Sequence, residues 1–170
     1  MKTSNISTPR EVREEIIHSL REIGFPAHLK GYVYIKTALE IILNKPESLE
    51  AITKELYPTI ARIHHTTPSR VERALRHGIE LVYDRNTPET LNELLGPSDW
   101  NKGKLANSEF LAVMAENLHM TLDRLTELKE EVLPQACKGI DEGARLLQLR
   151  QDLITLGVLT PSSLQGSNHV

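Results

Sequence analysis

The chain has 170 residues, of which 39% are hydrophobic and 4% aromatic, and its formal net charge at neutral pH is −3. These values suit one domain, or one domain with an appendage, whose core is built mainly from Leu, Ile, Val and Ala. The acidic balance excludes a uniformly basic nucleic-acid binder, so any affinity for DNA has to come from a local patch. The single cysteine, Cys137, excludes an intrachain disulfide framework and fits a reducing cytoplasm.

The first ten residues, 1–10, are polar, and we expect them to be flexible. They contain no apolar run that could serve as a signal peptide, and no part of the chain approaches the roughly 20 apolar residues of a membrane span. We therefore expect a cytoplasmic, nucleoid-associated protein with no membrane partner.

Apolar residues then recur at helical spacing. The pattern predicts helices over about residues 9–23, 30–43 and 47–56, with glycine and proline residues at the breaks between them. In the second helix we expect five residues to be available for burial: Val33, Ala38, Leu39, Ile41 and Ile42. No β-strand pattern stands out, which favours an all-α fold.

Residues 58–83 have the order of a helix-turn-helix. A short helix over 58–65 is expected to point Ile60, Ala61 and Ile63 inward. A longer helix over 68–83 follows after about three residues. Thr67 can cap this second helix and Pro68 suits its first turn, although the turn lacks the glycine often found there.

The longer helix has an apolar half and a polar half when its residues are placed at ~100° intervals. Arg73 and Arg76 are three residues apart, so their side chains leave the same face one turn apart. Each can offer a planar fork of donors to guanine in the major groove of DNA. The segment from Arg62 to Arg85 holds five arginines against three acidic residues. The alternative is an ordinary amphipathic helix with a solvated charged face.

Three separated motifs resemble one known family. The stretch Y-P-T-I-A-R-I-H-H-T-T-P-S-R-V-E-R-A-L-R-H-G-I-E (57–80) is similar to the DNA-binding effector domain of the sporulation response regulator, stage zero sporulation protein A. E-I-G-F-P-A-H-L-K-G-Y (22–32) is similar to the start of that domain, and N-S-E-F-L-A-V-M-A-E-N-L (107–118) to its last helix. The resemblance covers about residues 14–120.

The resemblance implies base readout by Arg73 and Arg76, with Glu72 beside them. It places three further residues near the DNA backbone: Ser69, Arg70 and His77. The family reads a short element, the 0A box, often in tandem copies, which implies double-stranded DNA as a partner and a homodimer on tandem sites. The family also contacts the RNA polymerase sigma subunit through the region after the recognition helix, here Thr87 to Leu95.

A short helix is expected to end at Leu95, and residues 96–106 form an internal loop. In the family this loop carries lysines near the DNA backbone, which here would be Lys102 and Lys104; the alternative is a solvated loop. We expect Trp100 to anchor the loop against the core rather than to stack on a base.

The last effector helix should begin at Asn107 or Ser108, which gives an effector domain over 11–120. Leucines at spacings of three and four then predict a helix over 121–133 that ends at Pro134, within a helical extension over 121–160. The extension is either a hairpin that packs on its own domain or an oligomerisation surface. Residues 161–170 are expected to be disordered.

The chain departs from the family at its start, because the effector motif is reached by about residue 14. We therefore expect no phosphoacceptor receiver domain, whose length is roughly that of a common single domain of about 120 residues, and no control by phosphorylation in cis.

Signals for catalysis are poor. His64 and His65 are adjacent, so they point to different faces and cannot share a metal as residues four apart do. The chain has no glycine-rich phosphate loop and no nucleophile elbow. We expect no enzyme activity, no metal site and no cofactor.

The sequence therefore predicts a compact all-α bundle that contains a helix-turn-helix, followed by a helical extension. The predicted function is sequence-specific DNA binding by a transcriptional regulator of sporulation or a related developmental programme. The alternative is a non-catalytic interaction protein that pairs with, or competes against, a full-length sporulation regulator.

Overall fold

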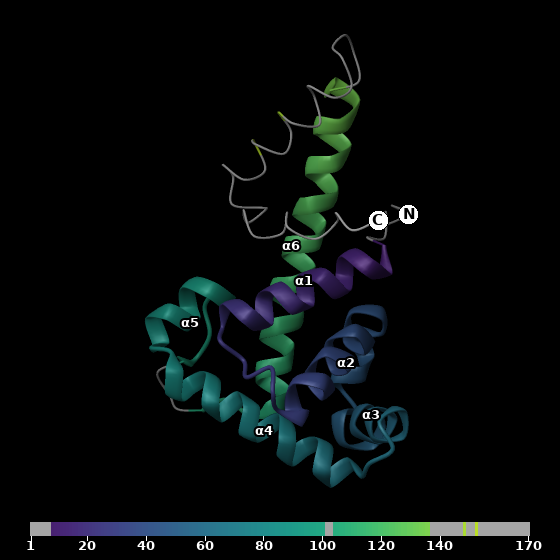
Figure 1. Cartoon of the computed structure of the whole chain (residues 1–170), viewed down its shortest axis with the longest axis vertical. Coiled ribbons are helices and arrows are strands. Elements are labelled where there is room, and N and C mark those ends of the chain that lie inside the picture. The colour runs from purple at the N-terminus through teal and green to yellow at the C-terminus, as the bar shows by residue number, and fades with distance from the viewer. Residues whose placement is uncertain (1–7, 101–103, 137–147, 149–151, 153–170) are drawn as a thin grey trace, which may run out of the picture. The chain divides into compact units, whose positions relative to one another are not determined.

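The computed structural model describes residues 8–100, 104–136, 148 and 152, and its elements are all helices (Figure 1). They are α1 (Pro9–Glu22), α2 (Lys30–Asn44), a 3₁₀-helix (Pro46–Leu49), a π-helix (Ile52–Leu56), α3 (Tyr57–Ile63), α4 (Pro68–Arg85), α5 (Pro88–Leu95) and α6 (Asn107–Ala136). The predicted all-α fold is confirmed. Among the described residues, no helix has the length and apolar character needed to cross a membrane.

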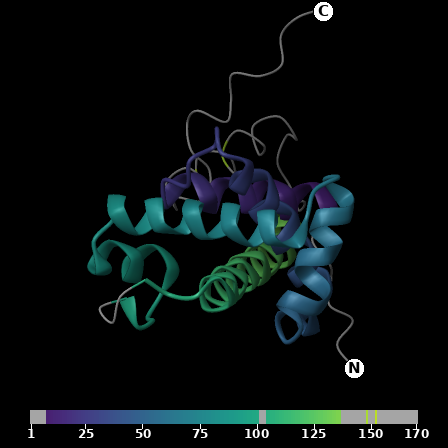
Figure 2. The same ribbon diagram turned by 90° about the horizontal axis from the view of Figure 1, so that it is seen from below.

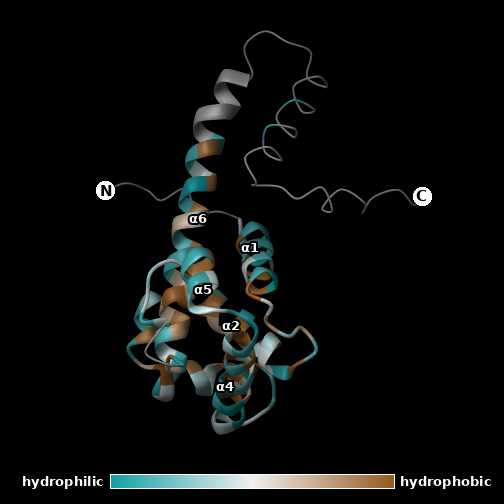
Figure 3. Ribbon diagram, turned by 90° about the vertical axis from the view of Figure 1, so that its left-hand side faces the viewer, coloured by the Kyte–Doolittle hydropathy of each residue, from teal (hydrophilic) through white to brown (hydrophobic). Residues whose placement is uncertain are grey.

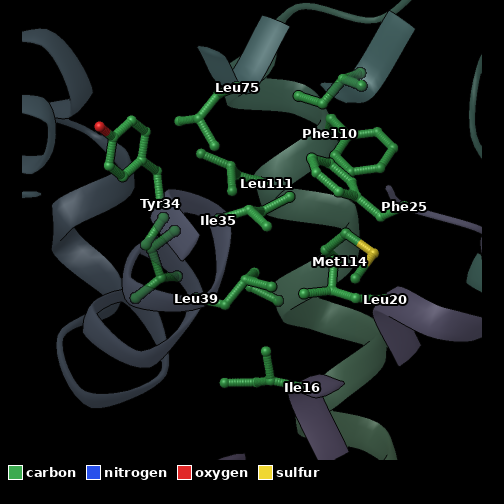
Figure 4. Packing of buried hydrophobic residues seen from close by; sticks show 14 of the residues in the cluster. Ile16, Leu20, Phe25, Tyr34, Ile35, Leu39, Leu75, Phe110, Leu111 and Met114 are labelled. Atoms are coloured by element: carbon green, nitrogen blue, oxygen red, sulfur yellow. The ribbon is translucent and has the colours of Figure 1, made fainter. Parts of the chain in front are cut away.

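The chain divides into two compact units, residues 1–126 and 127–170. The core of the first unit is formed by apolar faces of α1 to α6 together with the π-helix. Figure 4 shows part of it, where residues of α1, α2, α4 and α6 meet. Figure 3 shows hydrophobic and hydrophilic residues alternating along these helices, as amphipathic segments require. The residues of α6 predicted to point inward are all buried: Phe110, Leu111, Met114 and Leu118.

Two glycines determine how closely α4 packs on its neighbours. A Cβ atom at Gly31 of α2 would overlap the backbone carbonyl of Ala74 on α4. A Cβ atom at Gly78 of α4 would overlap the ring of Phe25, which lies in the segment between α1 and α2. Because both positions lack a side chain, the buried face of α4 sits directly against backbone on one side and an aromatic ring on the other.

The predicted regular helix over 47–56 is wrong. The chain instead forms a 3₁₀-helix that begins at Pro46 and a π-helix that ends at Leu56. The carbonyl of Ala51 accepts hydrogen bonds from the backbone N–H groups three, four and five residues later, at 3.1, 2.7 and 3.4 Å. The apolar spacing could not distinguish this widened turn from an α-helix, because both bury Ile52 and Leu56.

Two residues predicted to point inward are exposed. Val33 of α2 is 42% exposed and Ile63 of α3 is 51% exposed. The buried face of α2 instead runs through Tyr34 and Ile35, which leaves Val33 on the opposite side of the helix. Ile63 is the last residue of α3, where the chain turns away from the core.

The last helix, α6, continues without a break from Asn107 to Ala136 (Figure 1). The helix was predicted to end at Pro134, but α6 includes that residue and is described as far as Ala136. Leu122, Leu125 and Leu128 of α6, spaced three residues apart, form the predicted leucine stripe. Leu122 is buried, and Leu125 and Leu128 are half-buried. The predictions for residues 137–147 and 153–170, including Cys137, lie outside the described residues.

Candidate nucleic-acid interface

Helices α3 and α4 form the predicted helix-turn-helix (Figure 2). Thr67 caps α4, since its hydroxyl accepts a hydrogen bond from the N–H of Arg70 at 3.4 Å, and Pro68 occupies the first helical position. Both features were predicted from the sequence and are confirmed. They satisfy an otherwise free amide at the start of the helix and fix the residue at which α4 begins.

The turn between the two helices is built by histidines. His65 has a φ of +50°, so it adopts the left-handed conformation that a glycine would adopt more easily. The Nε2 atom of His64 lies 2.8 Å from the hydroxyl oxygen of Thr37 on α2. The imidazole ring of His64 packs against the ring of Tyr34, with 5.3 Å between the ring centroids. This histidine pair therefore shapes and anchors the turn, consistent with the predicted turn position.

The outer face of α4 is polar and accessible. Five of the predicted site residues are exposed on it: Ser69, Arg70, Arg73, Arg76 and His77. Glu72 lies among them and is partly exposed. The opposite face is buried through Val71, Leu75, Gly78, Ile79 and Val82. The helical periodicity of the sequence is therefore realised, and it gathers one set of predicted residues on a single convex surface.

Glu72 and Arg76 form an ion pair on this surface. The Arg76 Nη2 atom donates to the Glu72 carboxylate at 3.1 Å, and their side chains are 60% and 42% exposed. A pair this exposed contributes at most about 1 kcal/mol to stability, so it orients the guanidinium without locking it. Arg73 forms no ion pair with any residue that the structure describes. The exposed face of α4 therefore offers two guanidinium groups as hydrogen-bond donors: that of Arg76, oriented by Glu72, and that of Arg73, which is held by no ion pair among the described residues.

The loop after α5 is anchored to the C-terminal end of α4. Trp100 is 3% exposed, its indole N–H donates to the carbonyl of Gly96 at 2.9 Å, and its ring lies 6.0 Å from that of Tyr83. The predicted anchoring role of Trp100 is confirmed. Lys104 is exposed and forms a 3.1 Å ion pair with Asp84.

Lys104 thereby lies beside the last turns of α4, next to Asp84. Lys102 lies outside the described residues.

Asn107 of α6 contacts both helices of the helix-turn-helix on their buried side. The sequence analysis identified this residue only as a possible start of the last helix. Its Nδ2 atom donates to the hydroxyl oxygen of Tyr57 at 3.1 Å and to the backbone carbonyl of Glu72 at 3.1 Å. Burial raises the pKa of Tyr57 above its ordinary value, because desolvation disfavours the charged phenolate. The first turn of α6 is thus bonded to both helices of the helix-turn-helix. Nothing in the local pattern signals these contacts, which join residues 35 and 50 positions apart.

Metal ligation has no support within the described ranges, where no group of three or more His, Cys, Asp and Glu side chains converges. The polar groups on α4 instead match what nucleic-acid binding needs. They are exposed cations and hydroxyls on a convex helix, with a buried apolar face behind them.

The family comparison agrees with this geometry. Residues 16–118 match the family model described as sporulation initiation factor Spo0A C terminal. The chain belongs to this family. The matched range runs from within α1 into the middle of α6, so it includes the whole helix-turn-helix and the loop that carries Lys104. The Spo0A C-terminal family is a family of DNA-binding domains of sporulation regulators, and it is not a family of enzymes.

Proposed function

We propose that this Spo0A-type domain reads a 0A-box-like DNA element by placing α4 in the major groove. Arg73 and Arg76 contact base edges, with Glu72 beside them. Each bidentate arginine–guanine pair would supply about 1–3 kcal/mol of discrimination against a wrong base. The observation that carries the proposal is the placement of both guanidinium groups on the exposed face of a capped, tightly packed helix.

In the same proposal, five residues hold the DNA backbone: Ser69, Arg70, His77, Lys102 and Lys104. Contacts with phosphate fix the position and orientation of a protein on the duplex but carry no sequence information. The Lys104 ion pair with Asp84 is exposed, so the ammonium group can exchange that carboxylate for a phosphate.

The deciding experiment is fluorescence anisotropy with a labelled 0A-box duplex and a scrambled duplex of equal length, across a salt series. We expect a preference of ~10³-fold or more for the box and a steep loss of affinity as salt increases. Equal weak binding to the two duplexes would refute the proposal.

A matched pair of variants assigns the reading face. Arg76→Ala removes an arginine that is ion-paired four residues away with Glu72, and Arg10→Ala removes one paired in the same way with Glu14 on α1. We expect Arg76→Ala to reduce the preference for the box and Arg10→Ala to leave it unchanged. A similar loss in both variants would show that the effect is only one of net charge.

We further propose that the protein binds tandem boxes as a homodimer through the leucine stripe of α6, and that α5 faces the RNA polymerase sigma subunit. Leu125 and Leu128 are half-buried and therefore have apolar surface left to cover. Leu125→Glu should reduce self-association in sedimentation velocity without changing affinity for a single box. Unchanged self-association would exclude this stripe as the dimer contact.

A further inference from the structure

Asn107 occupies a position from which one side chain can control the geometry of the reading face. It is 6% exposed and is the first residue of α6. The two hydrogen bonds that its amide donates end on different helices, Tyr57 at the start of α3 and Glu72 in the second turn of α4. The amide therefore ties together the two halves of the helix-turn-helix at a point behind the exposed surface.

The contact on α4 lies directly behind the polar face. Glu72 accepts from Asn107 through its backbone carbonyl, and its side chain pairs with Arg76 on the outside. A shift of the α4 backbone at this residue would therefore move the carboxylate that orients the Arg76 guanidinium. Because a buried donor without an acceptor is unfavourable, the amide resists such a shift.

We propose that Asn107 is a positioning residue for base recognition, which fixes the turn of α4 that contains Glu72 and, through Glu72, the orientation of Arg76. This inference rests on the proposed reading of bases by α4. Hydrogen bonds to base edges weaken steeply with distance and angle, so a small displacement disrupts a bidentate contact. Contacts between a flexible cation and a phosphate tolerate the same displacement, so Asn107 controls base preference and leaves non-specific affinity unaffected.

The chain offers a matched control for this residue. Asn117 also lies on α6 and is partly buried, and its Nδ2 atom also donates to a backbone carbonyl, that of Leu94 on α5 at 3.3 Å. Within the part of the chain that the structure describes, its side chain is bonded to neither helix of the helix-turn-helix. Replacing each asparagine by alanine therefore removes one inter-helix tie from α6, and only Asn107→Ala removes the tie to the reading helix.

The experiment measures the affinity of the full chain, Asn107→Ala and Asn117→Ala for the 0A-box duplex and for the scrambled duplex. It is carried out well below the thermal unfolding midpoint of each variant. We expect Asn107→Ala to lower the preference for the box by about 5- to 150-fold, which is the discrimination supplied by one bidentate arginine–guanine pair. Its affinity for the scrambled duplex should stay that of the wild type, and Asn117→Ala should keep the wild-type preference.

Equal weakening on both duplexes in Asn107→Ala, or the same loss of preference in Asn117→Ala, would overturn the positioning role. If Asn107→Ala does not fold, Tyr57→Phe tests the same bridge by removing one of its two acceptors. A reduced preference in that variant supports the proposal, and a wild-type preference overturns it. A wild-type chain that shows no preference for the box would instead refute the proposed function itself.

Discussion

The two halves of α4 carry similar residues but use them differently. In the C-terminal half, Arg85 donates to the carbonyl of Gly24 at 2.9 Å, and Asp84 pairs with Lys104. In the N-terminal half, Arg70 and Arg73 form no ion pair with any residue in the described part of the chain. Arg85 near the C-terminal end of α4 is thus held by a hydrogen bond to the backbone, whereas Arg70 and Arg73 in the N-terminal half have guanidinium donors available to a ligand.

The difference arises from the segments that surround each half. Near the C-terminal end, the side chain of Asn86 donates to the carbonyl of Ile23, and Tyr83 accepts from the N–H of Leu105. Loops on two sides therefore occupy the polar groups there. The N-terminal half packs against α2 and α3 and is hydrogen-bonded to the start of α6. Its polar side chains on the opposite face are exposed.

The largest expected effect comes from disturbing the support that both halves share. Gly31→Ala would push a methyl group into the carbonyl of Ala74, and backbone cannot move aside as a side chain can. We expect a loss of about 2–4 kcal/mol in the free energy of unfolding, measured by urea denaturation with circular dichroism. Gly78→Ala should cost less, because the ring of Phe25 can shift. Equal stability of Gly31→Ala and the wild type would show that the two helices are not in close contact.

Replacing one arginine in each half of α4 by alanine tests the difference between the two halves directly. Arg73→Ala should cost about 1–3 kcal/mol on the 0A-box duplex, relax base preference and leave stability unchanged. Arg85→Ala should lower stability by about 1 kcal/mol, through loss of its bond to Gly24, and leave base preference unchanged. Anisotropy and urea denaturation on both variants separate these outcomes. If Arg73→Ala and Arg85→Ala changed base preference and the free energy of unfolding to the same extent, the division of α4 into a DNA-reading half and a half bonded to neighbouring loops would be contradicted.

The C-terminal half can be probed at the Lys104–Asp84 ion pair. Lys104→Ala should weaken binding to every duplex by at most about 1 kcal/mol at physiological salt and reduce the salt slope by about one. Asp84→Asn should do the reverse, because it frees the ammonium group and removes a negative charge near the DNA. A change in base preference in either variant would mean that Lys104 reads sequence, contrary to the proposed backbone role.

The smallest expected effect lies in the turn that leads into the reading half. His65→Gly relieves the left-handed conformation of a non-glycine residue, but glycine also gains freedom in the unfolded chain. We expect a net stabilisation of about 0.5 kcal/mol in urea denaturation, with unchanged DNA affinity. Clear destabilisation would indicate that the imidazole of His65 makes a contact that holds the turn.

Local pattern determined much of this protein from the sequence alone. Helical periodicity and capping residues predicted the all-α fold, the start of α4 at Pro68 and the inward face of α6, because each depends on residues a few positions apart. The same periodicity predicted that Arg73 and Arg76 share one face. The prediction failed where several geometries satisfy one apolar pattern, as in the π-helix that ends at Leu56. It also failed at Pro134, which α6 includes although proline disfavours the interior of a helix.

The tertiary structure alone decided which polar groups are available. The sequence could not show that Arg85 binds a carbonyl 61 positions away while Arg73 has no ion pair among the described residues. Nor could it show that Asn107 joins Tyr57 to Glu72. These contacts depend on how distant segments meet, and no spacing along the chain encodes them. The sequence therefore determined the surface on which the reading groups lie, and tertiary packing determined which of them are held in place and by what, because a hydrogen bond forms only where folding brings donor and acceptor within about 3 Å.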